Sequence, residues 1–175
     1  GAAWLRALPH RHKVFVAGNH DRCFEDQREE AVSLLGPDVV YLQDEGVVVE
    51  GLTIYGSPWQ PEFGSWAFNL PRGEPLRQKW DAIDEATDIL VTHGPPFGMG
   101  DHVPWAGHLG CRELRDAIAR VRPMLHVFGH IHEDGGLWKE GPSWVANVTT
   151  SEGERGVSVV EIRGGDVVPI VIPRP

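Results

Sequence analysis

The amino-acid sequence predicts a mixed α/β fold in which helices and strands share one domain. Two observations carry this prediction. Short runs of β-branched and aromatic residues alternate with segments that have helical periodicity. Strands also gather toward the C-terminus, where Gly164-Gly165 is typical of a hairpin turn between strands expected at 156–163 and 166–172. The 175 residues have the length of a single domain, 1–175, which would bury roughly 70% of the surface of the unfolded chain.

The other elements follow from periodicity and from turn residues. Helices are expected over 2–8, 26–35, 75–86 and 110–121, and strands over 13–17, 39–42, 46–50, 52–56, 88–92, 125–128 and 143–148. In the last helix Leu114, Ile118 and Val121 recur at helical spacing. The stretches 57–74 and 94–109 are rich in Gly, Pro and Trp without periodicity, which predicts long functional loops.

The charge balance narrows the classes of function. The chain has 25 acidic and 16 basic residues and a net charge of −9, which argues against nonspecific binding of nucleic acid. A small phosphate ester stays compatible, because a bound metal cation would dominate the local potential. No apolar run is long enough to span a bilayer. Two cysteines, Cys23 and Cys111, make no disulfide framework and suit a reducing cytosol, so a cytoplasmic location is expected.

Three short polar motifs each follow an apolar run. They are Gly18-Asn19-His20-Asp21, His93-Gly94-Pro95-Pro96 and Gly129-His130-Ile131-His132-Glu133. Open α/β sheets build their sites at the carboxyl ends of strands, and glycine permits close approach of the backbone. We therefore predict that Asn19, His93, His130 and His132 converge as ligands of a metal. Imidazole nitrogen and amide oxygen suit divalent Zn, Mn or Fe, which indicates hydrolytic chemistry.

His20 has a separate interpretation, because it sits between a predicted ligand and a carboxylate. A histidine beside a metal-bound phosphate can protonate the departing alkoxide as a general acid. Asp21 is then expected to hold the His20 ring in one tautomer. The alternative is that Asp21 caps the helix expected to begin near Asp26, although the spacing is poor for a cap.

The remaining histidines are weighed one by one. His10 and His12 are predicted to be ordinary surface residues. His126 lies inside an apolar strand and is predicted to be packed. His102 and His108 lie in a long loop, where a pocket role and a solvated role are equally compatible with the sequence.

The three motifs, in this order, resemble the third, fourth and fifth signature blocks of the calcineurin-like metallophosphoesterases. Residues 56–61 and 66–73 resemble the subgroup of metallophosphoesterase-domain proteins expressed in vertebrate brain. The resemblance implies a two-sheet β-sandwich flanked by helices, with two divalent ions, which could be Mn, Fe, Zn, Ni or Co. It implies that Asn19, His93 and His130 hold one ion and His132 the other, and that His20, supported by Asp21, is the general acid. The implied reaction is phosphoester hydrolysis by a metal-activated hydroxide.

The sequence departs from the family pattern in its first two blocks, an Asp-x-His and a Gly-Asp. Neither precedes Gly18; Gly100-Asp101 and Gly165-Asp166 have the letters of the second block but occur too late and are expected in a loop and a turn. His132 therefore lacks its partners for the second ion. The preferred explanation is that an N-terminal βαβ portion is missing, so that an exposed sheet edge favours a homo-oligomer. The alternative is a short, weakly active or inactive member that binds nucleotide with one metal.

Aromatic residues in the two long loops are candidates for contact with the substrate. Trp59, Trp66, Phe68 and Trp105 could stack on a nucleobase or could pack beneath the loops. Packing is the preferred interpretation for Trp66 and Phe68, and the choice is open for Trp59 and Trp105. Arg72 and Arg112 are candidates for phosphate contact, with a solvated surface role as the alternative. The predicted substrate is a small phosphodiester such as a cyclic nucleotide.

Overall fold

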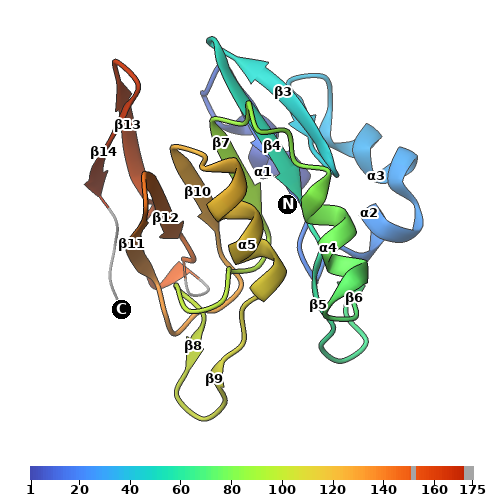
Figure 1. The fold of residues 1–175 in the computed structure, drawn as a ribbon. Coiled ribbons are helices and arrows are strands. Elements are labelled where there is room, and N and C mark those ends of the chain that lie inside the picture. The colour runs from blue at the N-terminus through green and yellow to red at the C-terminus, as the bar shows by residue number, and fades with distance from the viewer. Residues whose placement is uncertain (151–152, 172–175) are drawn as a thin grey trace.

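The fold is built around one six-stranded sheet. The structure, a computed structural model, describes residues 1–150 and 153–171. The strand order is β11-β12-β10-β7-β4-β3 (Figure 1). The bounds are β3 (Glu45–Val49), β4 (Leu52–Ser57), β7 (Ile89–Thr92), β10 (Leu125–Phe128), β11 (Gly136–Glu140) and β12 (Ser143–Asn147). The four inner strands are parallel, whereas β3 and β11 pair antiparallel at the edges. The prediction of a mixed α/β fold is confirmed.

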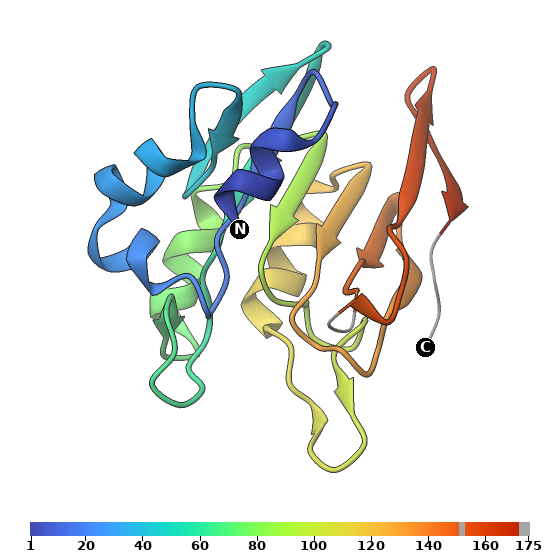
Figure 2. The same ribbon diagram turned by 180° about the vertical axis from the view of Figure 1, so that it is seen from behind.

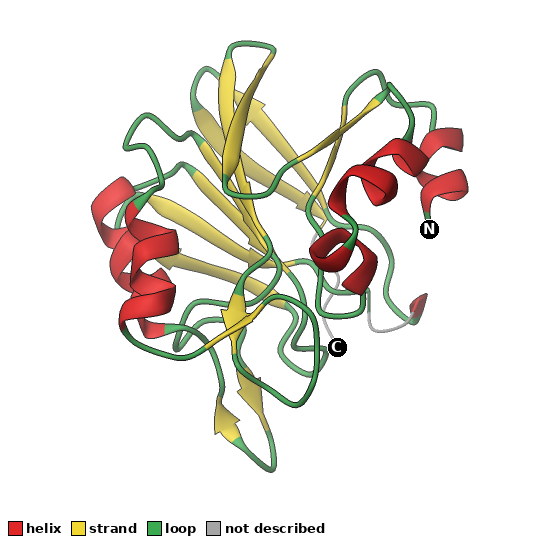
Figure 3. Cartoon of the chain, turned by 90° about the vertical axis from the view of Figure 1, so that its right-hand side faces the viewer, coloured by secondary structure: helices red, strands yellow, loops and turns green. Residues whose placement is uncertain are grey.

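Two helices cover one face of this sheet. They are α4 (Glu74–Asp81) and α5 (Arg112–Val121), and Figure 3 shows both on the same side of the strands. The predicted apolar stripe of α5 is buried, and Leu114 and Ile118 pack with Trp80 of α4 and Leu90 of β7. This packing fixes β7 within the sheet and so fixes the position of the residues that follow it.

A hairpin covers part of the opposite face. It consists of β13 (Val159–Arg163) and β14 (Asp166–Val171), and its turn falls at Gly164-Gly165 as predicted. Val167 packs against Leu125 and Ala146 of the central sheet. Figure 2 shows the hairpin on this side of the sheet. Gly165-Asp166 therefore belongs to a turn, as expected. Residue 172, the end of the strand expected at 166–172, lies outside the described residues.

The N-terminal segment forms a second layer on the same face as this hairpin (Figure 2). Its elements are α1 (Ala2–Ala7), β1 (Lys13–Phe15), α2 (Arg22–Asp26), α3 (Arg28–Leu35) and β2 (Val39–Tyr41). β1 and β2 pair in parallel as a separate sheet of two strands. Phe24, Leu35 and Tyr41 form its core. In the described part of the chain, the second layer of the expected sandwich thus consists of two-stranded pieces, and β1 is shorter than predicted.

Further features differ from the sequence prediction. β11 was not expected. The helix predicted at 26–35 is α3, which begins at Arg28, and the unpredicted helix α2 precedes it, separated by Gln27, which leaves helical geometry with φ −139° and ψ 52°. The helix predicted at 75–86 ends at Asp81. The long loops carry short pairs of strands, which are β5 (Gln60–Pro61) with β6 (Asn69–Leu70) and β8 (His102–Val103) with β9 (Gly107–His108). Within residues 1–150 and 153–171, no helix has the length and apolar character needed to cross a membrane.

Candidate metal centre

The parallel pairing of β7 and β10 brings His93 and His130 together. His93 directly follows β7, and His130 lies just beyond β10. The Nε2 atom of His93 is 3.0 Å from the Nδ1 atom of His130, and the ring centroids are 4.7 Å apart. His130 has φ 74°, a left-handed conformation that is uncommon outside glycine and costs energy that the surroundings must offset. The backbone thus turns the His130 ring toward His93.

The turn at residues 18–21 places Asn19 against the same pair. The Asp21 amide donates to the Gly18 carbonyl at 2.9 Å, and the Asp21 carboxylate accepts from the Gly18 amide at 2.8 Å. The backbone amide of Asn19 donates to Nε2 of His93 at 3.3 Å. A Cβ atom on Gly18 would lie 2.7 Å from Cε1 and Nδ1 of the His93 ring. The close contact between the turn and His93 therefore requires glycine at position 18. Gly94 and Gly129 of the other two motifs have no neighbour this close.

The electrostatic environment keeps this histidine pair neutral. The pKa of His93 is lowered to about 3, first by burial and then by the charges of His130, His20 and His132. The pKa of His130 is lowered to about 4, again first by burial and then by His132 and His20, while Glu133 acts in the opposite direction. Both rings are therefore neutral at pH 7 and keep a nitrogen lone pair. His20 and His132 act on both rings, so they lie within electrostatic reach of the pair.

These residues fit one divalent cation. Two neutral imidazoles face each other nitrogen to nitrogen beside an asparagine, at a turn where a Cβ would clash. Nitrogen and amide-oxygen ligands suit Zn, Mn or Fe. No three His, Cys, Asp or Glu side chains of the described residues gather as a metal site, so the first ion needs the Asn19 side chain beside the two histidines, and a second ion has only His132. His132 is exposed, and its carbonyl accepts from Arg155 at 2.6 Å.

His20 lies at the exposed tip of the same turn. The edge of its ring meets the indole of Trp66, with centroids 4.3 Å apart. The loop that carries Trp66 is tied to the turn, because the Ala67 amide donates to the Asn19 carbonyl at 3.1 Å. Packing was the preferred interpretation for Trp66, but nothing in the sequence indicated that it would pack on His20.

Asp21 does not contact His20 as expected. Its carboxylate closes the turn on the Gly18 amide, and among the described residues no hydrogen bond joins it to the His20 ring. Nor does its side chain cap a helix. Asp21 is the residue before α2 but makes no side-chain cap there, and the helix expected near Asp26 is α3, which follows Gln27. One oxygen of the Asp21 carboxylate is thus bound to the backbone of the turn.

A buried chain of hydrogen bonds fixes the turn that carries His93. The Thr92 hydroxyl donates to the Gly94 carbonyl at 2.8 Å, and it also lies 2.8 Å from Nε2 of His126. Because the hydroxyl has one hydrogen, Nε2 of His126 must donate to it. His126 is fully buried, as predicted, and its Nδ1 atom has no hydrogen-bond partner among the described residues. His126 therefore acts as a neutral donor beneath the turn.

Replacing His126 with Gln should flatten the acid sensitivity of the metal-free protein. Burial lowers the pKa of His126 to about 3, whereas an unfolded histidine titrates near pH 6.5. Between these values the unfolded state binds more protons, so stability is complete above pH 6.5 and falls as the pH drops. At pH 5.0 this one group should lower the free energy of unfolding by about 2 kcal/mol.

Urea unfolding at pH 7.5 and 5.0 measures this effect. We expect the loss between the two pH values to be about 2 kcal/mol smaller in His126→Gln than in the wild type. His12→Gln is the matched control, because that ring is exposed and pairs with Glu50. An unchanged loss in His126→Gln would show that His126 does not resist protonation in the fold.

A cavity of about 330 Å³ opens beside His130 and Gly94. Two predicted substrate residues line it. Trp105 is 78% exposed, on the hairpin formed by β8 and β9 that projects at the bottom of Figure 1. Arg72 also lines the cavity, but its guanidinium donates to the carbonyls of Leu109 and Gly110 at 2.6 and 2.7 Å. Arg72 thus braces the loop on which the cavity wall depends.

Trp59 lies elsewhere, and here the packing interpretation describes the structure. Its indole Nε1 donates to Asp44 at 2.8 Å, and Lys79 lies 4.2 Å from the ring centroid. The ring also packs edge-on against buried Phe68. Because its indole N–H and one face of its ring both have partners, Trp59 is a packing residue between its own loop and α4.

The two histidines of the second long loop differ in role: His108 stabilises the loop, whereas His102 is exposed. His108 pairs with Asp101 at 2.7 Å, and Asp101, fully buried, also accepts from the Gly110 amide at 2.9 Å. His102 is exposed; its backbone amide donates to Asp134, and its ring makes an edge contact with His108, with centroids 5.3 Å apart. Gly100-Asp101 is thus a structural part of the loop, as expected, and Arg112 stacks its guanidinium on Phe97 at 3.7 Å.

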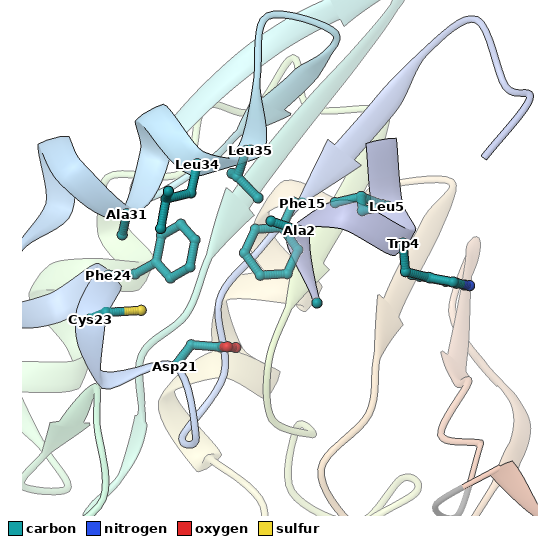
Figure 4. A pocket seen from close by; sticks show the side chains of 11 residues that line it. Ala2, Trp4, Leu5, Phe15, Asp21, Cys23, Phe24, Ala31, Leu34 and Leu35 are labelled. Carbon is teal, nitrogen blue, oxygen red and sulfur yellow. The ribbon is translucent and has the colours of Figure 1, made fainter. Parts of the chain in front are cut away.

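A second cavity, of about 350 Å³, lies between α1, α2, α3 and β1 (Figure 4). Phe15, Phe24 and Leu5 dominate its wall, and no histidine lines it. Asp21 and Cys23 also line it, but neither His93 nor His130 does. The cavity beside His130, which one of the paired histidines lines, is the candidate for phosphoester chemistry.

Comparison with known proteins agrees with this geometry. Residues 2–134 match the profile of the calcineurin-like phosphoesterases. Metallophosphoesterase domain-containing protein 1 of Homo sapiens is 42% identical over 170 residues, covering 83% of this chain and 52% of that protein. A UPF0046 protein of Caenorhabditis elegans is 37% identical over 166 residues, covering 78% of this chain and 42% of that protein. The chain thus spans about half the length of these relatives.

The same fold occurs in a crystal structure of a protein from Thermus thermophilus. It superposes with a TM-score of 0.58 at 19% sequence identity and covers 89% of this chain and 70% of that one. At this identity the likeness concerns the fold alone. Together with the extent of the profile match and the identity to the human relative, it leads to one conclusion: the chain belongs to the calcineurin-like phosphoesterase family.

Proposed function

We propose that this chain hydrolyses a small phosphodiester, with a cyclic nucleotide as the candidate substrate, at one divalent ion held by Asn19, His93 and His130. The observation that carries the proposal is the neutral pair of His93 and His130, 3.0 Å apart at the carboxyl ends of adjacent parallel strands. Membership of a metal-dependent phosphoesterase family supports it. When bound, such an ion lowers the pKa of water and neutralises charge on a phosphate.

The residues of the chain have separate tasks in this reaction. His93 and His130 supply neutral nitrogen ligands, because burial keeps them deprotonated. His20 stands at the exposed tip of the neighbouring turn, where it can give a proton to the departing oxygen of the ester. Trp66 limits the orientation of the His20 ring by edge contact. The cavity beside His130 receives the alcohol part of the substrate.

Hydrolysis of bis-p-nitrophenyl phosphate and of a cyclic nucleotide tests the proposal. Each is offered to the metal-free chain with Mn, Fe, Zn, Ni or Co added singly. Turnover that depends on the added metal and is lost in His93→Ala is the expected result. Metal-independent turnover, or turnover that survives in His93→Ala, would refute the assignment.

A second candidate is a one-metal module that binds nucleotide without efficient hydrolysis. The observation that favours it is His132, which stands exposed without a group of further ligands among the described residues. Calorimetry with a nucleotide and one metal separates the two functions. Binding without turnover would favour this candidate, and turnover would exclude it.

A further inference from the structure

The cavity beside His130 has an uneven charge. Arg72 is the only Arg or Lys among the described residues that line it, whereas Glu62 and Glu133 both line it. Both nitrogens at the end of the Arg72 guanidinium donate to loop carbonyls. Arg72 is thus held against the wall, and apart from the bound ion the lining has more acidic than basic side chains.

The two carboxylates are available to a ligand. Both are exposed, and among residues 1–150 and 153–171 neither forms a salt bridge. Glu133 lines the same cavity as His130. A cavity of about 330 Å³ is no wider than roughly one Debye length, 8–10 Å at physiological salt, so charges on its wall act on any group inside it.

Aromatic rings from the two long loops complete the wall. Phe63 is 63% exposed, and Trp105 is 78% exposed. Neither ring belongs to an aromatic pair or a cation–π pair in the described part of the chain. Their faces are therefore free, and such faces attract ammonium groups when carboxylates stand nearby. They attract no anion, because the face of an aromatic ring is itself negative.

We propose that Glu62 and Glu133, with Phe63 and Trp105, select the alcohol part of the substrate by its charge. The cavity admits a phosphodiester whose alcohol part is cationic or neutral and disfavours one with a further negative charge. This selectivity rests on the proposed hydrolysis and names its substrate class: esters of an amino alcohol, or of an uncharged flat alcohol, ahead of esters that carry a carboxylate or a second phosphate.

Three diesters that share a p-nitrophenolate leaving group test the selectivity. Their other alcohols are choline, ethanol and 3-hydroxypropionate, which carry a positive, a zero and a negative charge. We expect kcat/KM to fall in that order by about three- to tenfold per step, as expected for one or two charges at cavity distance in a partly screened site. The spread should shrink at least threefold in the double variant Glu62→Gln, Glu133→Gln.

Glu29→Gln is the matched control, because Glu29 is exposed on α3 and lies outside the cavity lining. It should leave the order and the spread unchanged. Equal kcat/KM for the three diesters, or a spread that persists in the double variant, would overturn the proposal while leaving hydrolysis itself in place.

A binding measurement separates this proposal from the proposed function. Tetramethylammonium and acetate are titrated into the metal-free chain at constant ionic strength, and the indole N–H of Trp105 is followed by NMR after assignment with Trp105→Phe. We expect tetramethylammonium to shift this signal, acetate to leave it unchanged, and the shift to be lost in the double variant. A shift without any turnover would refute hydrolysis and keep the charge-selective cavity; no shift would refute the cavity assignment.

Discussion

Replacing His93 with alanine should abolish metal binding and reduce metal-dependent turnover at least ~100-fold. His93 lies at the centre of the proposed site, with Nδ1 of His130 at 3.0 Å and the backbone amide of Asn19 at 3.3 Å from its Nε2 atom. Loss of a residue that merely orients a ligand typically costs 10–100-fold in metal affinity, so loss of a ligand should cost more. Competition with a chromogenic chelator measures the dissociation constant, and bis-p-nitrophenyl phosphate reports turnover.

Two controls make this result specific. His12→Ala removes a histidine that pairs with Glu50 at the surface, and it should bind metal as the wild type does. Thermal unfolding of His93→Ala without metal shows whether the fold survives the change. If His93→Ala folds and its dissociation constant stays within threefold of the wild type, the ion is not held by the pair described here.

Replacing His20 with alanine should slow the reaction according to the leaving group. A general acid contributes typically 10²–10⁴-fold when the departing oxygen is a poor leaving group. An alkyl diester or a cyclic nucleotide should therefore lose about 100-fold or more in kcat. A p-nitrophenyl diester, whose leaving group needs no proton, should lose only a few-fold. The ratio of the two losses is the measured quantity, and metal affinity should stay unchanged.

Asp21→Asn distinguishes two roles of the neighbouring carboxylate. In the structure Asp21 accepts from the Gly18 amide, and an asparagine oxygen can accept the same bond. The variant should therefore keep the leaving-group dependence of the wild type. If Asp21→Asn instead loses activity toward alkyl diesters selectively, as His20→Ala should, Asp21 supports the acid as the sequence suggested. Equal losses on both diesters in His20→Ala would remove His20 from the role of acid.

The position of the histidine pair could be predicted from the sequence because it follows from strand geometry. His93 and His130 each follow a short apolar run, and parallel strands end at the same edge of a sheet. Neighbouring strands β7 and β10 meet this condition. Asn19 was predicted on the same grounds, yet its strand β1 belongs to a separate sheet, and the approach depends on Gly18 instead. The motif correctly predicted that Asn19 lies beside His93, but strand geometry alone did not explain why.

The aromatic residues could not be placed in the same way. A tryptophan in a loop without periodicity gives no sign of which side its indole faces. Trp59 turned toward Asp44 and Lys79, Trp66 toward His20, and Trp105 toward the cavity and solvent. Each orientation depends on partners distant in the sequence. The same holds for Arg72, whose contacts with Leu109 and Gly110 join the two long loops.

The local errors in the fold have similar causes. The break at Gln27 arises where α2 and α3 both pack on the N-terminal core, through Phe24 and Leu35. Strand β11 pairs only with β12, at the edge of the sheet in the described part of the chain. Because Gly136 begins this short strand and Gly141 follows it, the sequence pattern did not distinguish it from a loop. Tertiary contacts determine where these helices and this strand begin and end, and the periodicity of a single sequence carries no information on such contacts.

The number of metal ions that the chain retains tests the central claim most directly. The protein is saturated with Mn or Zn and desalted, and metal per chain is measured by plasma mass spectrometry for the wild type, for His93→Ala and for His132→Ala. We predict about one ion per chain in the wild type, loss of that ion in His93→Ala and its retention in His132→Ala. A wild type without retained metal, or an ion that persists in His93→Ala, would contradict a metal site built on Asn19, His93 and His130.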